Sequence, residues 1–173
     1  MYGPKKYVLI FAQANNKIVM VLKNKPEHLK GFLNLIGGKV ESGEDEAQAA
    51  RRELTEETGL IQYKDPEYYG LLKGEDSDIY CFKAFVTYAE LDPDKQETEE
   101  ISWFDINEVL VHPKLIPNLK VIIPLMQSNT ENWTVIDVRP NWQEAEVHTV
   151  KLILENTTTF LEINIKKGDK RIE

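Results

Sequence analysis

The stretch LIGGKVESGEDEAQAARRELTEETGL, residues 35–60, is the most informative part of this sequence, because glycines and acidic side chains are concentrated in it. Ser42 is an N-cap candidate three residues before Asp45, a spacing typical of helix starts. The Ala- and Glu-rich segment behind it runs without a helix breaker to Gly59, and glycine commonly follows the last helical residue. We therefore predict one helix of about four turns that stops at Gly59.

Three glutamates share one face of this predicted helix. At about 100° per residue, Glu53, Glu56 and Glu57 fall within an arc of about 100°. The neighbouring arc, which is suited to packing against a sheet, holds three apolar residues, Ala47, Ala50 and Leu54. Anions this close repel one another, and a hard divalent cation such as Mg²⁺ suits a cluster of carboxylate oxygens. The face is either a metal platform or an ordinary solvated acidic surface.

The spacing of the whole stretch matches a known motif. From Gly38 it reads Gly, five residues, Glu44, seven residues, Arg-Glu-Leu at 52–54, one residue, Glu-Glu at 56–57, one residue, and Gly-Leu at 59–60. This pattern resembles the Nudix box of the Nudix hydrolase superfamily at every defining position. The resemblance implies an α/β fold, the Nudix α/β/α sandwich with a mixed sheet, over residues 5–128.

The resemblance also implies an activity. Members of the superfamily hydrolyse a nucleoside diphosphate linked to a further group X, and water attacks phosphorus with the help of a divalent metal. Mg²⁺ is the expected ion and Mn²⁺ the alternative. The physics agrees, because clustered carboxylates and a divalent cation together activate water and offset the charge of the pyrophosphate.

Roles can be carried over to the box by position. The resemblance assigns metal binding and water activation to three carboxylates, those of Glu53, Glu56 and Glu57. Arg52 is expected to orient Glu53 rather than to contact the substrate. Gly38 and Glu44 are expected to set the loop–helix geometry, and a backbone carbonyl of Gly37 or Gly38 is a further candidate metal ligand.

A catalytic base or an extra ligand often comes from a later loop in this family. Glu97, Glu99 and Glu100 are the candidates here, just before the run Ile-Ser-Trp-Phe at 101–104. Glu97 is preferred for its spacing to Trp103. A charged, solvated loop is the alternative interpretation of the same residues.

Four residues are candidates for substrate binding. MutT-like nucleoside triphosphate sanitisers carry phosphate-contacting basic residues before the box and directly after its first Gly, and Lys23 and Lys39 occupy these places. Asn34 resembles the Asn before Gly-Gly-Lys-Val in members that sanitise purine triphosphates, and Asn118 falls where such enzymes place a base-reading amide. Asn both donates and accepts hydrogen bonds, as reading an oxidised purine requires. The alternatives are surface lysines, a loop-capping Asn34 and a helix N-cap at Asn118.

The segments around the box alternate between strand-like and helix-like patterns. Residues 7–14 and 18–23 flank Asn15-Asn16 and predict a hairpin, because Asn tolerates positive φ. Further strands are predicted at 68–73, 79–88 and 100–104, and a shorter helix at 118–127, kinked or shortened by Pro124. We predict a Nudix hydrolase domain over residues 1–128.

A β-rich C-terminal extension is predicted over residues 129–173, with strands at 133–138, 147–154 and 159–165. Apolar and polar residues alternate in the last two of these strands, which indicates half-buried strands. A two-stranded hairpin is marginal by itself in water, so its apolar face should dock on the Nudix domain or on a second subunit. An interface in a homodimer is favoured over a lid beside the substrate pocket.

Composition narrows the class of protein. The 173 residues include 21 Lys and Arg against 29 Asp and Glu, a net charge of −8, which gives no overall footprint for nucleic acid or an anionic membrane. The single cysteine, Cys81, cannot form an internal disulfide, and this fits a reducing compartment. The sequence shows neither an export signal nor an apolar run long enough to span a bilayer. A cytoplasmic location is expected.

The sequence therefore predicts a Mg²⁺-dependent Nudix pyrophosphohydrolase whose partner is a nucleotide. The favoured substrate is a (d)NTP such as an oxidised purine triphosphate, cleaved to NMP and pyrophosphate. ADP-ribose, NADH or a dinucleoside polyphosphate is the alternative, and a Nudix module that senses a nucleotide without cleaving it is a third possibility. Leu33 and Ile36 stand where family members often carry Trp and Pro, which leaves the subfamily open.

Overall fold

The described residues form one mixed sheet of nine strands. In the computed structural model they are residues 3–61, 64–93, 98–137, 147–154 and 160–166. The strands are β1 (Lys5–Ala14), β2 (Lys17–Leu22), β3 (Leu33–Leu35), β4 (Glu67–Lys73), β5 (Ser77–Phe85), β6 (Glu100–Asp105), β7 (Trp133–Asp137), β8 (Val147–Leu154) and β9 (Phe160–Lys166). Their order is β3-β2-β1-β5-β4-β7-β8-β9, and β6 also pairs with β2. The β1–β5 and β4–β7 pairs are parallel and the other pairs antiparallel.

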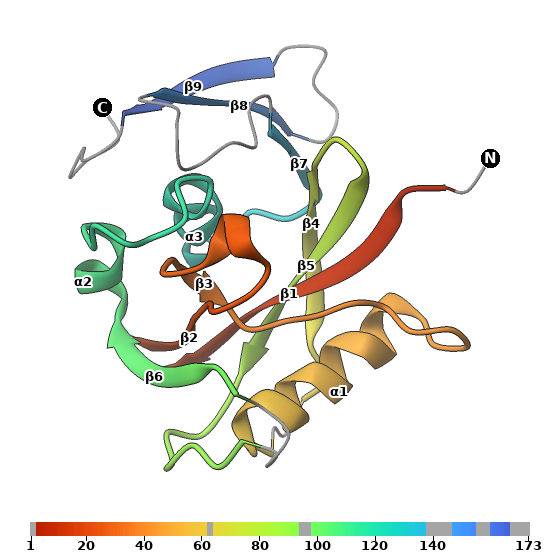
Figure 1. Ribbon diagram of the computed structural model, residues 1–173, viewed down its shortest axis with the longest axis vertical. Helices are drawn as coiled ribbons and strands as arrows, with labels where there is room; N and C mark the ends of the chain where they lie inside the picture. The colour runs from red at the N-terminus through yellow and green to blue at the C-terminus, as the bar shows by residue number, and fades with distance from the viewer. Residues whose placement is uncertain (1–2, 62–63, 94–97, 138–146, 155–159, 167–173) are drawn as a thin grey trace.

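Helices cover both faces of this sheet. The helix α1 (Glu46–Thr58) lies on one face, and α2 (Ile106–Leu110) and α3 (Leu119–Gln127) lie on the other (Figure 1). A buried cluster fills each side: Ala50 and Leu54 of α1 belong to one, and Leu119 and Ile122 of α3 to the other. The predicted α/β/α sandwich with a mixed sheet is confirmed.

Local sequence patterns predicted most of these helices and strands. Asn15 has φ 53° between β1 and β2, as the predicted hairpin requires. The strand predicted at 79–88 begins earlier, at Ser77, and ends at Phe85. Three short elements were not predicted: β3, α2 and the 3₁₀ helix η1 (Glu27–Leu29). β3 has only three residues and exists because it pairs with β2. No local sequence pattern therefore predicts it.

The ends of α1 come from its own sequence. Asp45, not Ser42, is the N-cap: its carboxylate accepts a hydrogen bond from the Gln48 N–H, and the Gln48 side chain accepts one from the Asp45 N–H. The predicted N-cap was therefore three residues too early, since this reciprocal pair satisfies the first turn. Gly59 ends the helix in the left-handed conformation with φ 69°, which confirms the predicted C-terminal stop.

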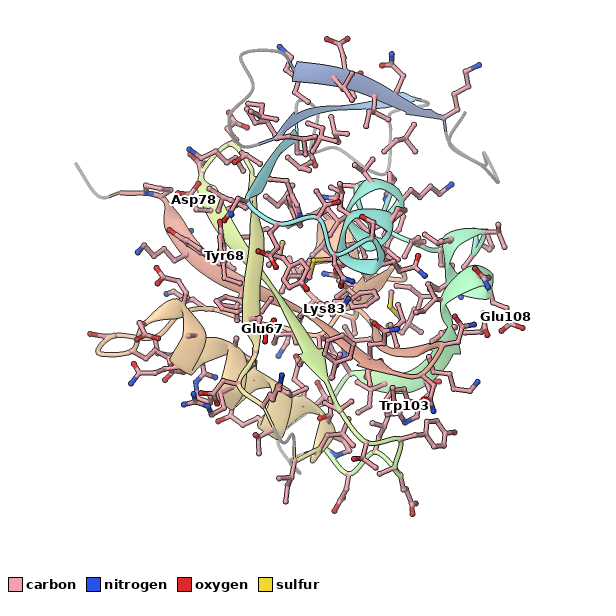
Figure 2. The ribbon with its side chains drawn as sticks, turned by 180° about the vertical axis from the view of Figure 1, so that it is seen from behind. Glu67, Tyr68, Asp78, Lys83, Trp103 and Glu108 are labelled. Atoms are coloured by element: carbon pink, nitrogen blue, oxygen red, sulfur yellow. The ribbon has the colours of Figure 1, made fainter. Side chains whose placement is uncertain are left out.

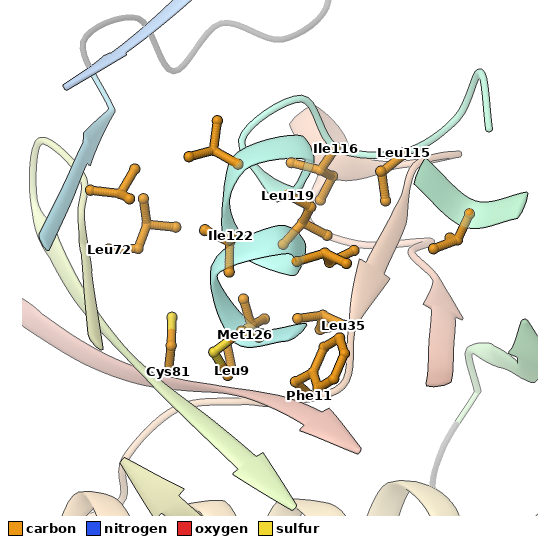
Figure 3. Packing of buried hydrophobic residues seen from close by; sticks show 14 of the residues in the cluster. Leu9, Phe11, Leu35, Leu72, Cys81, Leu115, Ile116, Leu119, Ile122 and Met126 are labelled. Atoms are coloured by element: carbon orange, nitrogen blue, oxygen red, sulfur yellow. The ribbon is translucent and has the colours of Figure 1, made fainter. Parts of the chain in front are cut away.

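The larger core lies between α3 and the sheet. Figure 3 shows Leu119, Ile122 and Met126 of the helix facing Leu9 and Phe11 of β1. Each of the three helix residues is 0 % exposed. Pro124 lies inside this helix, which nevertheless continues to Gln127 as predicted, so Pro124 does not shorten it.

A buried lysine fixes the end of α3 to β5. Lys83 Nζ donates hydrogen bonds to the Met126 carbonyl at 2.8 Å and to Asn129 Oδ1 at 2.6 Å, and it lies 4.8 Å from the centroid of the Phe85 ring. Figure 2 shows Lys83 from the rear of the molecule. Burial lowers the pKa of this amine. Its hydrogen-bond partners are a helix-terminal carbonyl and an amide, an aromatic face lies beside it, and the charge of Glu67 partly opposes the lowering of its pKa.

The C-terminal strands continue the sheet of the preceding domain. β7 pairs in parallel with β4, and β8 and β9 follow, so that these strands lie over α3 (Figure 1). Val150, Leu152 and Ile165 are buried in the same core as α3, as their alternation predicts. This apolar face therefore packs on the chain's own domain. The domain boundary at residue 128 and a homodimer through the extension remain predictions.

The contact between Gly70 and Trp133 allows the docking of β7 to be tested. A Cβ added to Gly70 would lie 2.2 Å from the Trp133 ring, which is 1 % exposed. We expect Gly70→Ala to lower the free energy of unfolding by about 1–3 kcal/mol, the usual cost of overpacking a core. Urea-induced unfolding measures this. Gly3→Ala is the control, because a Cβ at Gly3 meets nothing within 4 Å, and equal stability of both variants would contradict the packing of Trp133 on β4.

Candidate active site

Two glutamates of α1 point at the glycine turn that follows β3. The Gly37 N–H donates to Glu57 Oε2 at 2.9 Å. A Cβ added to Gly38 would lie 2.2 Å from Glu53 Oε1, so only glycine leaves room for that carboxylate. Glu53 is 9 % exposed and Glu57 6 % exposed. The turn and the helix therefore hold two carboxylates close to the main chain in a largely buried place.

The acidic and apolar faces of α1 overlap rather than lie side by side. Ala50 and Leu54 are buried as predicted, but Ala47 is exposed. Ala49, which lies on the glutamate side of the helix, is 0 % exposed. The prediction for Ala47 was wrong because the helical period does not say which part of the helix the sheet covers, and this residue of the first turn is left exposed.

Arg52 joins the box carboxylates into one network. Its Nη1 donates to Glu53 Oε1 at 2.8 Å and to Glu56 Oε2 at 3.0 Å. Nε and Nη2 donate to Glu44 at 3.1 and 2.7 Å, and Nη2 also donates to the Lys39 carbonyl at 3.0 Å. These hydrogen bonds raise the pKa of Arg52. One guanidinium therefore offsets the repulsion among three carboxylates and fixes Glu53, as the predicted orienting role requires.

Because of this network, the contribution of Glu44 to the stability of the fold should depend on pH. The hydrogen bonds from Arg52 hold the pKa of Glu44 below its usual 4.5. A lowered carboxylate pKa contributes stability that is present above the unfolded-state value and is lost as the pH falls through the folded-state value. We expect Glu44→Gln to be less stable than wild type at pH 7, and the difference to close below about pH 4.5. Urea unfolding across this range tests it, and a difference independent of pH would contradict it.

The later loop is only partly described. Glu97, the preferred additional carboxylate, lies outside the described residues. Glu99 accepts hydrogen bonds from Lys23 Nζ, from the Asn24 N–H at 2.8 Å and from the Lys25 N–H at 3.3 Å. Its side chain is 4 % exposed. Glu99 thus anchors the segment after β2, a contact between distant parts of the chain that no local pattern indicates.

A cleft of about 420 Å³ opens beside the glycine turn. Gly37, Gly38, Asn34 and Lys23 all line it. Its volume falls in the range of ~300–1,000 Å³ typical of small-molecule sites. Lys39 is exposed and is not among the lining residues, so the structure does not bring its side chain to the cleft.

An inner pocket of about 170 Å³ continues this cleft, because the two share Leu9, Asn34 and Ile79 among other residues. Asn118 lines the inner pocket and is 5 % exposed. It precedes α3 without a side-chain hydrogen bond that caps the helix. The structure therefore brings Asn34 and Asn118 to one pocket, although 83 residues separate them in the sequence.

Several lining residues were not predicted. They are mostly aliphatic or come from unrelated elements: His28, Leu29, Leu72, Ser77, Ile79, Ile116 and Asp137. No spacing rule connects them, because the sheet register and the packing of α3 assemble them. Asp137 belongs to β7, so the C-terminal extension contributes to the pocket.

The donor set of the box suits a hard divalent cation. Within the described ranges, no group of three or more His, Cys, Asp and Glu side chains is arranged to hold a metal ion, and Arg52 already engages Glu53 and Glu56. The Gly38 carbonyl, which is a candidate metal ligand, already accepts a hydrogen bond from the Val8 N–H at 2.8 Å. Mg²⁺ usually keeps several waters and binds through one or two carboxylates together with substrate phosphates. The carboxylates present fit that mode better than a closed protein cage.

Comparison with known proteins agrees with this geometry. The NUDIX domain family matches residues 3–126. The chain belongs to the NUDIX family. It is 29 % identical over 111 residues to the NAD-capped RNA hydrolase NudC of Vibrio parahaemolyticus, a match that covers 63 % of this chain and 42 % of NudC. It is 30 % identical over 114 residues to the oxidized purine nucleoside triphosphate hydrolase of Danio rerio, covering 63 % and 71 % of the two chains. This NUDIX chain therefore spans less than half the length of that NudC.

Solved structures share the fold of this NUDIX chain. The MutT protein of Bacillus halodurans is 23 % identical with a TM-score of 0.60, covering 77 % of this chain and 88 % of its own. The NUDIX domain of Shewanella oneidensis NrtR, solved with ADP ribose, is 18 % identical with a TM-score of 0.62, covering 75 % and 91 %.

Among the described helices, none combines the length and the hydropathy that a bilayer crossing requires.

Proposed function

We propose that this NUDIX chain is a Mg²⁺-dependent pyrophosphohydrolase of nucleoside diphosphates linked to X, with a (d)NTP such as an oxidised purine triphosphate as the favoured substrate. One observation carries the proposal: a continuous cleft leads from the glycine turn beside Glu53 and Glu57 to the amides of Asn34 and Asn118. Gly37 and Gly38, which adjoin Glu57 and Glu53, line the cleft, whereas the glutamates themselves are not among its lining residues. The products would be NMP and pyrophosphate.

The residues of the Nudix box would have separate roles in the reaction. Glu53, Glu56 and Glu57 would hold Mg²⁺ or Mn²⁺, which when bound offsets the charge of the phosphate oxygens and helps to activate water. Arg52 donates to Glu53 and Glu56; it would keep Glu53 in place, and Glu56 would have to leave Arg52 to bind the cation. The Gly37 N–H orients Glu57, and Gly38 leaves the space that the Glu53 carboxylate needs. Glu97 stays the proposed additional carboxylate.

Cationic side chains at the cleft favour an anionic substrate. Lys5 and Lys23 line it together with Gly37 and Gly38, and the carboxylate of Asp76 is also among the lining residues. Lys23 pairs with Glu99, so its proposed phosphate contact requires it to share or exchange that partner. Lys39 remains a proposed phosphate ligand only if its exposed side chain turns toward the cleft.

The comparisons support a second candidate substrate class. The NudC relatives are named for NAD-capped RNA, and the NrtR domain was solved with ADP ribose. ADP-ribose, NADH or a dinucleoside polyphosphate is therefore the second candidate substrate, since each has a pyrophosphate between a nucleoside and X. The complete set of box carboxylates supports turnover rather than a module that only senses a nucleotide. A cytoplasmic location stays a prediction.

A substrate panel tests the proposal. The full chain is incubated with Mg²⁺ and 8-oxo-dGTP, dGTP, ADP-ribose, NADH or a dinucleoside polyphosphate, and NMP, phosphate and pyrophosphate are followed separately. We expect NMP and pyrophosphate from a triphosphate. NMP and ribose 5-phosphate, formed from ADP-ribose alone, would establish the second class. No product from any nucleotide would overturn the proposal.

A further inference from the structure

We propose that two copies of this chain associate through β9, which pairs antiparallel with β9 of a second copy. β9 (Phe160–Lys166) is the last strand in the order of the sheet, and β8 is its one neighbour among the strands that the structure describes. Figure 1 shows β9 at the end of the sheet opposite to α1. It lies beyond residues 3–126, which match the NUDIX domain family. The proposed dimer therefore involves a part of the chain outside the family domain and does not depend on the proposed function.

β9 lacks the features that usually keep an edge strand from pairing. An edge strand presents a row of backbone N–H and C=O groups, and natural proteins protect it with proline, a β-bulge, a short length or an inward-pointing charge. β9 has seven residues and no proline, and its register with β8 runs without a bulge. Its charged residues, Glu162 and Lys166, are exposed on the face away from the core. The backbone edge of β9 is thus suited to pairing with a further strand.

One side chain of β9 shows where a second strand would add burial. Leu161, Ile163 and Ile165 share the face that packs toward α3, because side chains alternate along a strand. Ile165 is 4 % exposed in the core and Ile163 packs against this core, but Leu161 is 59 % exposed. A strand of a second copy beside β9 would cover Leu161 and extend this apolar face.

The sequence of β9 complements itself in one register. Antiparallel pairing about Ile163, the midpoint of the strand, uses all seven residues. It places Ile163 opposite Ile163 and Leu161 opposite Ile165 of the second copy, so that apolar pairs line one face. On the other face, Glu162 falls opposite Asn164 and diagonal to Lys166 of the second copy, which brings opposite charges together.

Neighbouring registers are less favourable. Pairing centred on Glu162 would put the two Glu162 side chains directly opposite each other, and like charges in that position are destabilising. Pairing centred on Asn164 would leave Leu161 without a partner in β9. The side chains of β9 therefore select the register about Ile163.

An interface of this kind is closed and small. Pairing about a two-fold axis uses the edge of β9 once in each copy, so it stops at a dimer. One pair of strands of this length falls at the weak end of specific interfaces. The dissociation constant should therefore lie in the micromolar range.

The mass of the full chain in solution tests the inference. Sedimentation velocity across the micromolar range should show a reversible shift from monomer to dimer as the protein concentration rises. Leu161→Lys should raise the dissociation constant at least about 10-fold, because it removes apolar burial from both copies and adds a charge at the edge. Ile61→Lys is the matched control, because Ile61 is an apolar residue outside β9 that is 83 % exposed. This variant should associate like wild type.

A disulfide tests the register. In Ile163→Cys the Cβ atoms of the two new cysteines lie about 5 Å apart, within reach of a disulfide after a small adjustment. In Leu161→Cys the same residue of the second copy lies about 13 Å further along the strand. Mild oxidation should therefore link Ile163→Cys into a covalent dimer far faster than Leu161→Cys. Wild type should stay unlinked, because Cys81 is 1 % exposed.

Four outcomes would overturn the inference. Two are a wild-type chain that stays monomeric at every concentration and a dimer that Leu161→Lys leaves unchanged. The others are no disulfide in Ile163→Cys and equally fast disulfide formation in both cysteine variants, because either contradicts the register. Residues of β9 line neither the cleft nor its inner pocket, so Leu161→Lys should turn over nucleotides like wild type. Failure of the dimer and failure of nucleotide hydrolysis are therefore separate results.

Discussion

Glu57→Gln is expected to lower turnover by roughly two to four orders of magnitude, the range associated with losing a positioned acid–base group. The substitution removes the charge that would hold a divalent cation but keeps the shape of the side chain. The amide oxygen of Gln can still accept the hydrogen bond that the Gly37 N–H donates to Glu57. The fold should therefore survive, and the melting temperature of the metal-free protein should stay the same or rise slightly as repulsion within the box falls.

Steady-state kinetics with Mg²⁺ and thermal unfolding with EDTA measure the two effects. Glu108→Gln is the matched control, because Glu108 is an exposed helix glutamate on α2, far from the box (Figure 2). Near-normal turnover in Glu57→Gln would refute the catalytic assignment. A drop of several degrees in the metal-free melting temperature would show that Glu57 serves the fold instead.

Gly38→Ala should cost about 100-fold in turnover, the scale expected when a catalytic group is displaced by about 1 Å. The added Cβ would lie 2.2 Å from Glu53 Oε1 and 2.4 Å from its carboxyl carbon. Glu53 must therefore rotate away from the place where Arg52 holds it. Because the end of a flexible side chain gives way rather than the backbone, stability should change far less than turnover.

Gly3→Ala is the control for this steric effect, since a Cβ at Gly3 meets no atom within 4 Å. The kinetic measurement should be paired with urea unfolding, so that lost activity is separated from lost structure. Wild-type kinetics in Gly38→Ala would mean that the position of the Glu53 carboxylate does not matter for the reaction.

The sequence predicts what depends on local pattern. The Asn15–Asn16 hairpin, the stop at Gly59 and the alternation in β8 and β9 each follow from a few neighbouring residues, and the structure confirms them. The relative placement of Glu53 and Glu57 also follows from the helix period alone. The motif was recognisable because one helix and one turn carry it.

What the sequence did not predict depends on contacts between distant segments. The pairing of Lys23 with Glu99 joins the end of β2 to the start of β6. Asp137 enters the pocket only because β7 lies parallel to β4. Ala47 was assigned to the buried face because the helical period does not say where the sheet ends. The burial of Lys83 was not predicted, because a lysine inside a strand is usually half exposed.

We propose that this chain hydrolyses a nucleotide pyrophosphate in the cleft beside the box and that it needs a divalent metal to do so. The most direct measurement is turnover of the best nucleotide of the panel in EDTA, followed by titration with Mg²⁺ in excess of the chelator. We expect no turnover above background in EDTA and saturable recovery with Mg²⁺, with NMP as a product. Undiminished turnover in EDTA, or no turnover of any nucleotide with saturating Mg²⁺, would contradict it.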